Sequence, residues 1–297
     1  MAPKEFHDLS ELQLNINPQS GEVESSWGNL GFWSTQNQSN ASLNYPQACR
    51  QLACEVAAMA DLKGDHNLLD TGFGCGDQLA VWLQEFKVNN LTGINLSVSQ
   101  THHAQKKIAA LKLDADIRCE LKVGDGCQPS AWQGLDKHFD RIIALDCIYH
   151  FTNKSQYFSL CKQRLGEGGA LVVSDLLLNA SIKNIWHKCI LKTICYFSHI
   201  PFQNIKTIDE YRAELNLLGL EIARDKDISD QVFLPFGQWL EQYISELSDK
   251  KSDIGRLSWL KYRGTAKFLR WAYEKKIFSY HLLRIEHHGE FSNKSTL

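Results

Sequence analysis

The sequence has no apolar run long enough to cross a bilayer as a helix. Such a helix needs about 18 or more consecutive apolar residues. The purest run, 170–178, is far shorter and is interrupted by Ser174 and Asp175. The N-terminal residues MAPKEFHDLSELQLN contain no apolar core of a secretory signal. We therefore expect a cytoplasmic protein with neither a transmembrane segment nor a signal peptide.

Paired cysteine spacing is missing as well. The chain has nine cysteines, an odd number, and no CxxC sequence. Zinc sites need paired ligand spacing, and disulfide frameworks of small secreted proteins usually have an even number of cysteines. Several cysteines lie in apolar segments, as Cys147 does in IIALDCIYHF. We expect buried, reduced thiols and no metal site.

An excess of one charge is also absent. Lys and Arg number 32 and Asp and Glu 34, which gives a net charge of −2. Nucleic-acid-binding proteins usually carry a basic excess, so we expect no nucleic-acid partner. With 43% apolar and 22% charged residues the composition is that of a globular protein, and 297 residues fit one α/β domain with additions.

Strand-like and helix-like segments alternate along most of the chain. Strands are predicted at 67–72, 91–97, 117–125, 139–151, 170–178, 220–228 and 278–288, with EGG at 167–169 as a turn. Helices are predicted at 45–62, 77–86, 98–113, 154–165, 207–219, 231–249 and 256–276. A capping box of Thr207 and Glu210 supports one helix start. Alternation of this kind predicts βαβ units and a mostly parallel sheet with helices on both faces.

The most informative segment is DTGFGCGD, residues 70–77, at the end of the first strand. Its glycines at 72, 74 and 76 allow a tight turn and close approach of a ligand to the backbone. A dinucleotide fingerprint would require glycine at position 77, where Asp77 stands. The acidic Asp70 suits a cationic ligand better than a phosphate.

This segment resembles the first motif of class I S-adenosylmethionine-dependent methyltransferases. GINLSVSQ (93–100) is similar to a pattern of tocopherol methyltransferases, cyclopropane fatty-acid synthases and sugar O-methyltransferases, and VGDG (123–126) and FDRIIALDCIYHF (139–151) follow in the family's order. The resemblance covers nearly the whole chain. It implies a single domain, 1–297, with a Rossmann-like, doubly wound, seven-stranded α/β sheet. Its parts are an N-terminal cap and helix (1–62), a cofactor-binding core (63–178), a lid (179–206) and the rest of the core with a helical insertion (207–288).

The resemblance also implies how S-adenosylmethionine is held. Gly72, Gly74 and Gly76 belong to the loop under the methionine part, with Asp70 turned toward its ammonium group or toward the loop. Asn95 and Gln100 bind the ribose. Asp125 accepts from the adenine amino group, with Gly126 and Cys127 beside the ring. The aromatic segment 27–33, ending in Trp33, covers the cofactor. Asp146 is the last of the residues implied to bind the cofactor. Turn or capping roles for Asn95 and Asp125 remain the alternative.

Methyl transfer to a hydroxyl requires alignment and a base. His150, just past the fourth strand, and Asp175, in the apolar fifth strand, lie near the strand ends where ligands of such sheets bind. Related sugar O-methyltransferases use a histidine and an aspartate at similar places. We predict His150 as base and Asp175 as its orienting acid, with Asp146 and Tyr149 as second-rank candidates. Packing of His150 under the lid is the alternative.

Two segments bear on the acceptor. Residues 182–202 are rich in apolar and aromatic residues, and in this family the insertion forms a lid over an apolar or aromatic small-molecule acceptor. Residues 250–276 hold nine Lys or Arg against two acids, with interleaved aromatic residues. That pattern is compatible with peripheral membrane contact and a lipid-like acceptor, with an anionic acceptor, or with a solvated face.

Three functions are open at this point. The first is a methyltransferase acting on a small apolar acceptor, or methylating or methylenating a lipid or isoprenoid at a membrane. The second is a non-catalytic cofactor-binding partner subunit, which His150 and Asp175 disfavour. The third is an NAD-dependent oxidoreductase, which Asp77 disfavours. The residues leave the oligomeric state open.

Overall fold

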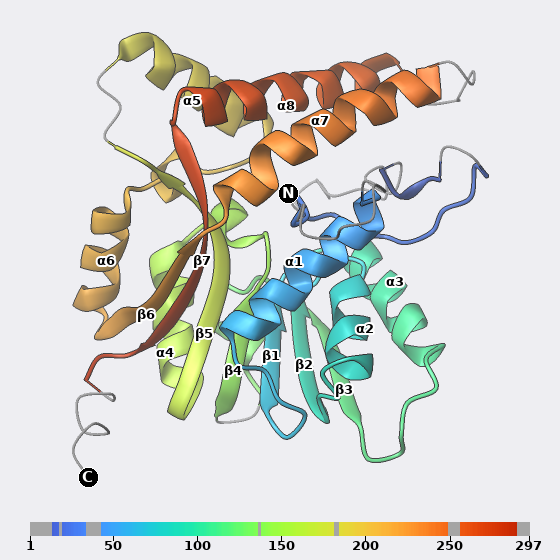
Figure 1. Cartoon of the computed structure of the whole chain (residues 1–297). Helices are drawn as coiled ribbons and strands as arrows, with labels where there is room; N and C mark the ends of the chain where they lie inside the picture. The colour runs from blue at the N-terminus through green and yellow to red at the C-terminus, as the bar shows by residue number, and fades with distance from the viewer. Residues whose placement is uncertain are drawn as a thin grey trace.

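A seven-stranded sheet forms the centre of the computed structural model (Figure 1). The structure describes residues 14–17, 20–33, 43–135, 138–180, 184–248 and 256–289, without the side chains of 247, 248 and 256–262. The strand order is β3-β2-β1-β4-β5-β7-β6. β7 runs antiparallel to both of its neighbours, β5 and β6, and the other strand pairs of this sheet are parallel. The strands are β1 (Asn67–Thr71), β2 (Asn90–Asn95), β3 (Arg118–Val123), β4 (Phe139–Ala144), β5 (Leu165–Leu178), β6 (Leu220–Asp227) and β7 (Phe278–His287). The predicted fold class is confirmed.

Helices cover both faces of this sheet. One face carries α1 (Tyr45–Met59), α2 (Asp77–Gln84) and α3 (Val98–Ala109), and the other carries α4 (Lys154–Arg164) and α6 (Ile208–Leu217) (Figure 1). Three more helices lie beyond the carboxyl ends of the parallel strands: α5 (Ile185–Phe197), α7 (Ser229–Ser248) and α8 (Arg256–Glu274). The last two pack side by side as a hairpin.

Local sequence explains where several of these helices begin. Asn44 accepts from the backbone of Gln47, whose side chain bonds back to the Asn44 amide, and Thr207 and Glu210 form the predicted capping box at α6. Each box satisfies amides that the first helical turn leaves without an intrahelical acceptor.

The turn predicted at 167–169 is instead an irregularity inside β5. Leu165 pairs with Phe139 and Ala170 with Arg141, so the register against β4 shifts between these two pairs. Gly168 has a φ of 68°, a left-handed conformation that glycine adopts without steric cost. The glycines thus form a bulge, and the strand continues through them.

The sheet order places a natural ligand site at the carboxyl ends of β1 and β4. The chain winds outward from β1 to β3 in one direction and from β4 in the other. The crossover connections therefore diverge between β1 and β4, which opens a crevice outside the strand ends. None of the helices that the structure describes is long and apolar enough to cross a membrane.

Candidate active site

A cavity of about 790 Å³ lies at this crevice. The loops after β1, β2, β3 and β4 form its floor, and the N-terminal segment 26–30 closes one side. Its far wall comes from α5, α7 and α8, with apolar residues that include Leu191, Phe233, Phe236, Phe268 and Leu269. The cavity therefore has a polar end at the strand tips and an apolar end under the three outer helices.

The glycine loop leaves room for a ligand at the polar end. Gly72 and Gly74 line the cavity, with φ angles of 79° and 55°. A Cβ at Gly72 would lie 2.6 Å from the sulfur of Cys147, whereas a Cβ at Gly74 would meet no protein atom within 4 Å. Gly74 therefore faces open cavity space that a side chain would fill. This cradle fits the predicted position of the cofactor's methionine part.

Two predicted ribose ligands lie together on the cavity wall. Nδ2 of Asn95 donates to Oε1 of Gln100 at 3.1 Å, and both residues line the cavity. Asp125 and Gly126 line it as well, and Oδ1 of Asp125 accepts from the Cys127 amide at 2.9 Å. The four residues thus border one side of the same polar end.

Four other residues predicted to bind cofactor lie behind the cavity wall. Asp70 is buried, and its carboxylate accepts from Gln78 Nε2 at 2.9 and 3.0 Å and from Trp82 Nε1 at 2.6 Å. It therefore turns toward α2, and burial raises its pKa to about 6. The remaining three are Gly76, Cys127 and Trp33.

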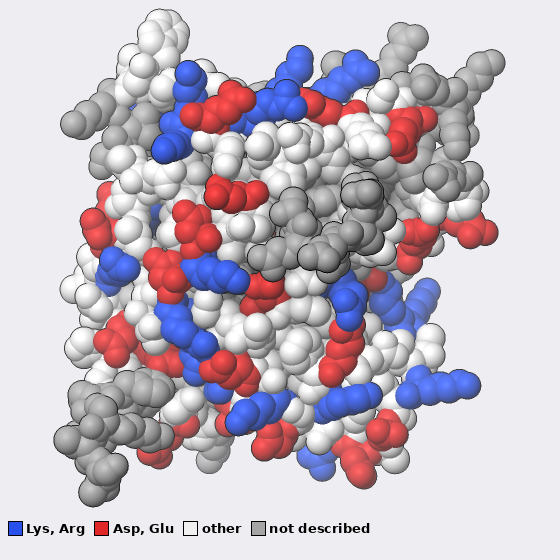
Figure 2. Space-filling model, in the orientation of Figure 1, with Lys and Arg blue, Asp and Glu red and all other residues white. Residues whose placement is uncertain are grey.

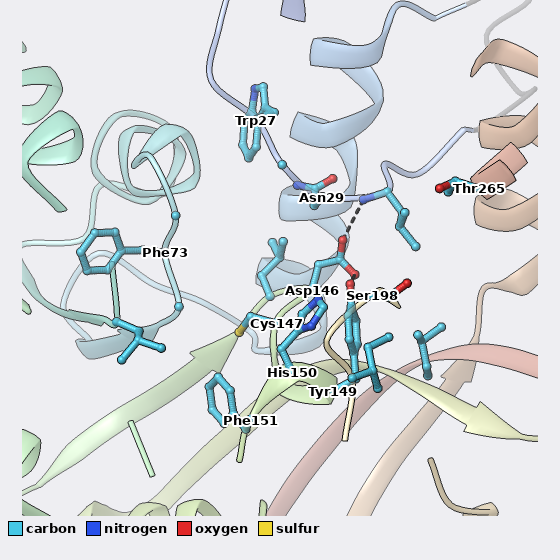
Figure 3. Close-up of a pocket in the computed structure, with 18 of the residues that line it drawn as sticks. Trp27, Asn29, Phe73, Asp146, Cys147, Tyr149, His150, Phe151, Ser198 and Thr265 are labelled. Carbon is cyan, nitrogen blue, oxygen red and sulfur yellow. Dashed lines mark hydrogen bonds between the residues drawn. The ribbon is translucent and has the colours of Figure 1, made fainter. Parts of the chain in front are cut away.

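Each of those three has a packing role that explains its position. A Cβ at Gly76 would lie 2.7 Å from that of Ala104, so this glycine allows α2 to approach α3 closely. Cys127 is 1% exposed. The Trp33 ring packs against Phe236 and Trp239 of α7. None of these residues lines the cavity in which we expect the cofactor; in the N-terminal segment, Trp27 and Asn29 reach it (Figure 3).

Asp146 is a junction of hydrogen bonds at the end of β4. One carboxylate oxygen accepts from the Leu30 amide at 2.8 Å, and the other accepts from the hydroxyls of Tyr149, at 2.7 Å, and Tyr280. Its φ of 53° is unusual for a residue other than glycine. No sequence pattern indicated Tyr280, which comes from β7, far along the chain. The junction ties the N-terminal segment to the cavity floor.

His150 lines the cavity between Tyr149 and Phe151 (Figure 3). It ends a short 3₁₀ turn, Ile148–His150, and its Nδ1 lies 3.4 Å from the backbone oxygen of His199. A carbonyl oxygen can only accept, so this contact favours a proton on Nδ1 and a lone pair on Nε2. The lone pair is what a general base requires.

Asp175 does not line the cavity, and the predicted pairing with His150 is corrected. Its carboxylate lies 2.5 Å from Nζ of Lys154, and both side chains are buried. Burial raises the Asp175 pKa and lowers that of Lys154, while the ion pair opposes both shifts. A carboxylate in an apolar strand did indicate a buried partner, but the sequence did not identify Lys154.

Asn204, which the sequence analysis missed, holds the backbone on both sides of His150. Its Nδ2 donates to the backbone oxygens of Tyr149, at 3.0 Å, and Phe151, at 2.6 Å. Its own backbone oxygen accepts from Lys154 Nζ at 3.1 Å. Asp175 is therefore linked to the His150 turn only indirectly, through Lys154 and Asn204.

The predicted lid contributes one wall of the cavity. Leu191, Ile194, Cys195 and Phe197 of α5, and Ser198 just after it, line the apolar end. Residues 181–183 of the lid, like 250–255 of the basic stretch, lie outside the described residues. Within the described ranges, no group of three or more His, Cys, Asp or Glu side chains is arranged to hold a metal.

Comparisons with known proteins identify the family and the fold. A family model described as mycolic acid cyclopropane synthetase matches residues 37–256. Erythromycin 3''-O-methyltransferase of Saccharopolyspora erythraea is 23% identical over 251 residues, covering 82% of this chain and 78% of that protein. A 27-O-demethylrifamycin SV methyltransferase of Amycolatopsis mediterranei is 27% identical over 207 residues, covering 68% and 71%. The mycolic acid cyclopropane synthase CmaA1, solved with SAH and CTAB, has a similar fold, with a TM-score of 0.73 at 13% identity over 94% of each chain.

Proposed function

The chain belongs to the mycolic acid cyclopropane synthetase family and is an S-adenosylmethionine-dependent methyltransferase, and from this premise we propose that it methylates a hydroxyl group on an apolar small molecule, with His150 as the general base. The observation that carries the proposal is the position of His150. It lines the cavity just after β4, and its ring contacts the backbone of His199, just past α5. We further propose that the enzyme acts in the cytoplasm, where its nine free cysteines stay reduced.

The polar end suits the cofactor. We propose that the loop of Gly72 and Gly74 holds its methionine part, that Asn95 and Gln100 hold the ribose, and that Asp125 accepts from the adenine. When bound, S-adenosylmethionine supplies a methyl group on a positively charged sulfur, which leaves as S-adenosylhomocysteine. The chain itself must align the acceptor and remove its proton.

The other titratable groups beside His150 are poorly suited to act as the base. Burial raises the pKa of the Tyr149 phenol and of the Cys147 thiol well above their ordinary values, so both stay protonated. The Asp146 carboxylate already accepts from two phenols and one amide. The His199 carbonyl favours a proton on Nδ1 of His150. We propose that Nε2 takes the acceptor's proton as the acceptor oxygen attacks the methyl carbon.

An apolar acceptor fits the remaining space. Pockets for small molecules are mostly apolar, with a few polar groups that fix orientation. Here the outer helices provide the apolar walls and His150 the polar group. The name of the Saccharopolyspora relative specifies transfer to an oxygen, which supports a hydroxyl acceptor. A lipid or isoprenoid acceptor is the second candidate, favoured by the exposed apolar side chains of α5.

The test is steady-state methyl transfer to a panel of apolar alcohols, phenols, amines and alkenes by the parent protein and by His150→Ala. We expect His150→Ala to lower kcat by roughly 10²–10⁴, with S-adenosylhomocysteine affinity by calorimetry within about twofold. His102→Ala, on exposed α3, is the control. Equal rates for His150→Ala and the control would contradict the role of His150. Methylation of only amines or alkenes would contradict a hydroxyl acceptor.

A further inference from the structure

Helix α5 is unusual in what it exposes to solvent. Its inner side lines the cavity, yet Trp186 is 75% exposed, Tyr196 78% and Phe197 71%. Ile185 and Ile190 are exposed as well. With about 3.6 residues per turn, these five side chains and Cys189 and Thr193 follow one continuous strip along the helix. Large exposed apolar patches mark interaction sites more often than single exposed residues do.

The charges on α5 all have one sign. Its sequence, IWHKCILKTICYF, contains Lys188 and Lys192 and no Asp or Glu. Both lysines are exposed and lie along one flank of the apolar strip. Trp and Tyr gather where membrane meets water, and lysines beside them are attracted to anionic headgroups. The surface is amphipathic in the manner of a helix that lies in a bilayer interface.

The same helix separates the cavity from solvent. Phe197 lines the cavity and is also exposed on the side of the apolar strip. A second depression, lined by 195–197 and 199–201, shares Cys195, Phe197 and Ile200 with the cavity lining. Whatever covers the outer strip of α5 therefore lies directly against a wall of the cavity.

The neighbouring helix α8 is less suited to insertion. Trp271 packs against His187 of α5, Tyr273 donates to Asp230, and Arg270 pairs with Glu241. Lys and Arg side chains along the edge where α8 lies are interspersed with Asp and Glu (Figure 2). In the described part of α8 the aromatic side chains are thus held against other helices, whereas those of α5 remain exposed.

We propose that the outer strip of α5, Ile185 to Phe197, docks the protein on an anionic lipid bilayer, with Lys188 and Lys192 on the headgroups. The α5 wall of the cavity then lies at the membrane surface. A second copy of the chain fits the strip less well, because a face that carries lysines and no acids repels a copy of itself. An acidic protein would pair with the lysines but would leave the wide aromatic strip without a matching surface.

Flotation with lipid vesicles tests this directly and needs no methyl-transfer activity, so it is independent of the acceptor and of the role of His150. The full chain should float with vesicles of phosphatidylcholine and phosphatidylglycerol. It should float much less with phosphatidylcholine alone, and less as salt increases. The variant Trp186→Ser/Tyr196→Ser should lose at least about fivefold in binding. Leu217→Ser, an 89% exposed leucine on α6, is the matched control and should bind as the parent does.

Lysine variants separate charge from apolar contact. Lys188→Ser/Lys192→Ser should lower binding by about fivefold per lysine, while Lys106→Ser on α3 should not. Circular dichroism and thermal melting verify that each variant folds. Equal binding by the Trp186→Ser/Tyr196→Ser variant and Leu217→Ser, or no preference for anionic vesicles, would overturn the proposal. So would a dimeric parent that the α5 variant converts to monomer, because α5 would then be an interface between copies.

Discussion

Nζ of Lys154 lies 2.5 Å from Oδ2 of Asp175, with 2% and 0% of the two side chains exposed. Removing one partner leaves a buried charge without its counterion. We therefore expect Lys154→Met or Asp175→Leu alone to lower the free energy of unfolding by about 3–5 kcal/mol. The double variant leaves neither charge. Its loss of unfolding free energy should be much smaller than the sum of the losses of the two single variants. Urea denaturation of all four proteins measures this, and additive losses would show that the two charges are not coupled.

The second prediction concerns the glycine loop. Gly74 and Gly134 both have positive φ, 55° and 75°, and a Cβ would meet no protein atom within 4 Å at either. Alanine at each should therefore cost a similar 1–2 kcal/mol of stability from backbone strain. Only Gly74 lines the cavity, so only Gly74→Ala should weaken S-adenosylhomocysteine binding, by tenfold or more in calorimetry. Equal affinity of both variants would remove this loop from the cofactor site.

The sequence predicted those features that local patterns encode. Alternating apolar segments indicated the seven strands, and Thr207 with Glu210 marked the start of α6. Gly72 and Gly74 were found because a close backbone approach requires glycine at a fixed place after a strand. His150 was found because it follows a strand end directly.

What the sequence could not predict depends on contacts between distant segments. Tyr280 reaches Asp146 across 134 positions, and Asn204, near the end of the predicted lid, reaches the His150 turn. Asp175 was assigned to His150 because both lie at strand ends. A strand alternates its side chains between two faces, and the apolar run around Asp175 did not indicate which face carries it. Its partner is instead Lys154, at the start of α4, the helix before β5.

The third prediction is a pH dependence of stability from Asp70. Burial raises its pKa from 3.8 to about 6, against the hydrogen bonds from Gln78 and Trp82. Between about pH 4 and 6 the unfolded chain loses this proton before the folded chain does. Stability from this group therefore falls as pH rises through that window. Two pKa units correspond to on the order of 3 kcal/mol.

Asp70→Asn should remove this dependence. The free energy of unfolding of Asp70→Asn and that of the parent are to be measured at pH 4 and at pH 7. Relative to the parent, the variant should be more stable at pH 7 than at pH 4 by up to about 3 kcal/mol. Other titrating groups are common to both proteins and cancel. Urea denaturation at the two pH values is the measurement. A difference that stays constant with pH would mean that Asp70 keeps an ordinary pKa in the fold.

The last prediction is that Asn204 positions the His150 turn. Its Nδ2 donates to the backbone oxygens on both sides of His150, at 3.0 and 2.6 Å. Asn204→Leu keeps a similar volume and loses both hydrogen bonds, each of which contributes about 0.5–1.5 kcal/mol. The turn, and with it the imidazole, should then sample other positions. A misplaced base lowers the rate of the chemical step more than it lowers ligand binding, because alignment matters most in the transition state.

We therefore expect Asn204→Leu to lower kcat by at least tenfold while S-adenosylhomocysteine affinity changes by less than about twofold. Asn67→Leu is the matched control, because the Asn67 side chain also donates to a backbone oxygen, that of His138, but at the start of β1 and away from the cavity. A purely structural role for Asn204 would lower the stability of both variants and leave both kcat values alike. The loss should also disappear when His150 is already alanine, since a turn that no longer carries the base has nothing to position. Full additivity of Asn204→Leu and His150→Ala in kcat would contradict action through His150.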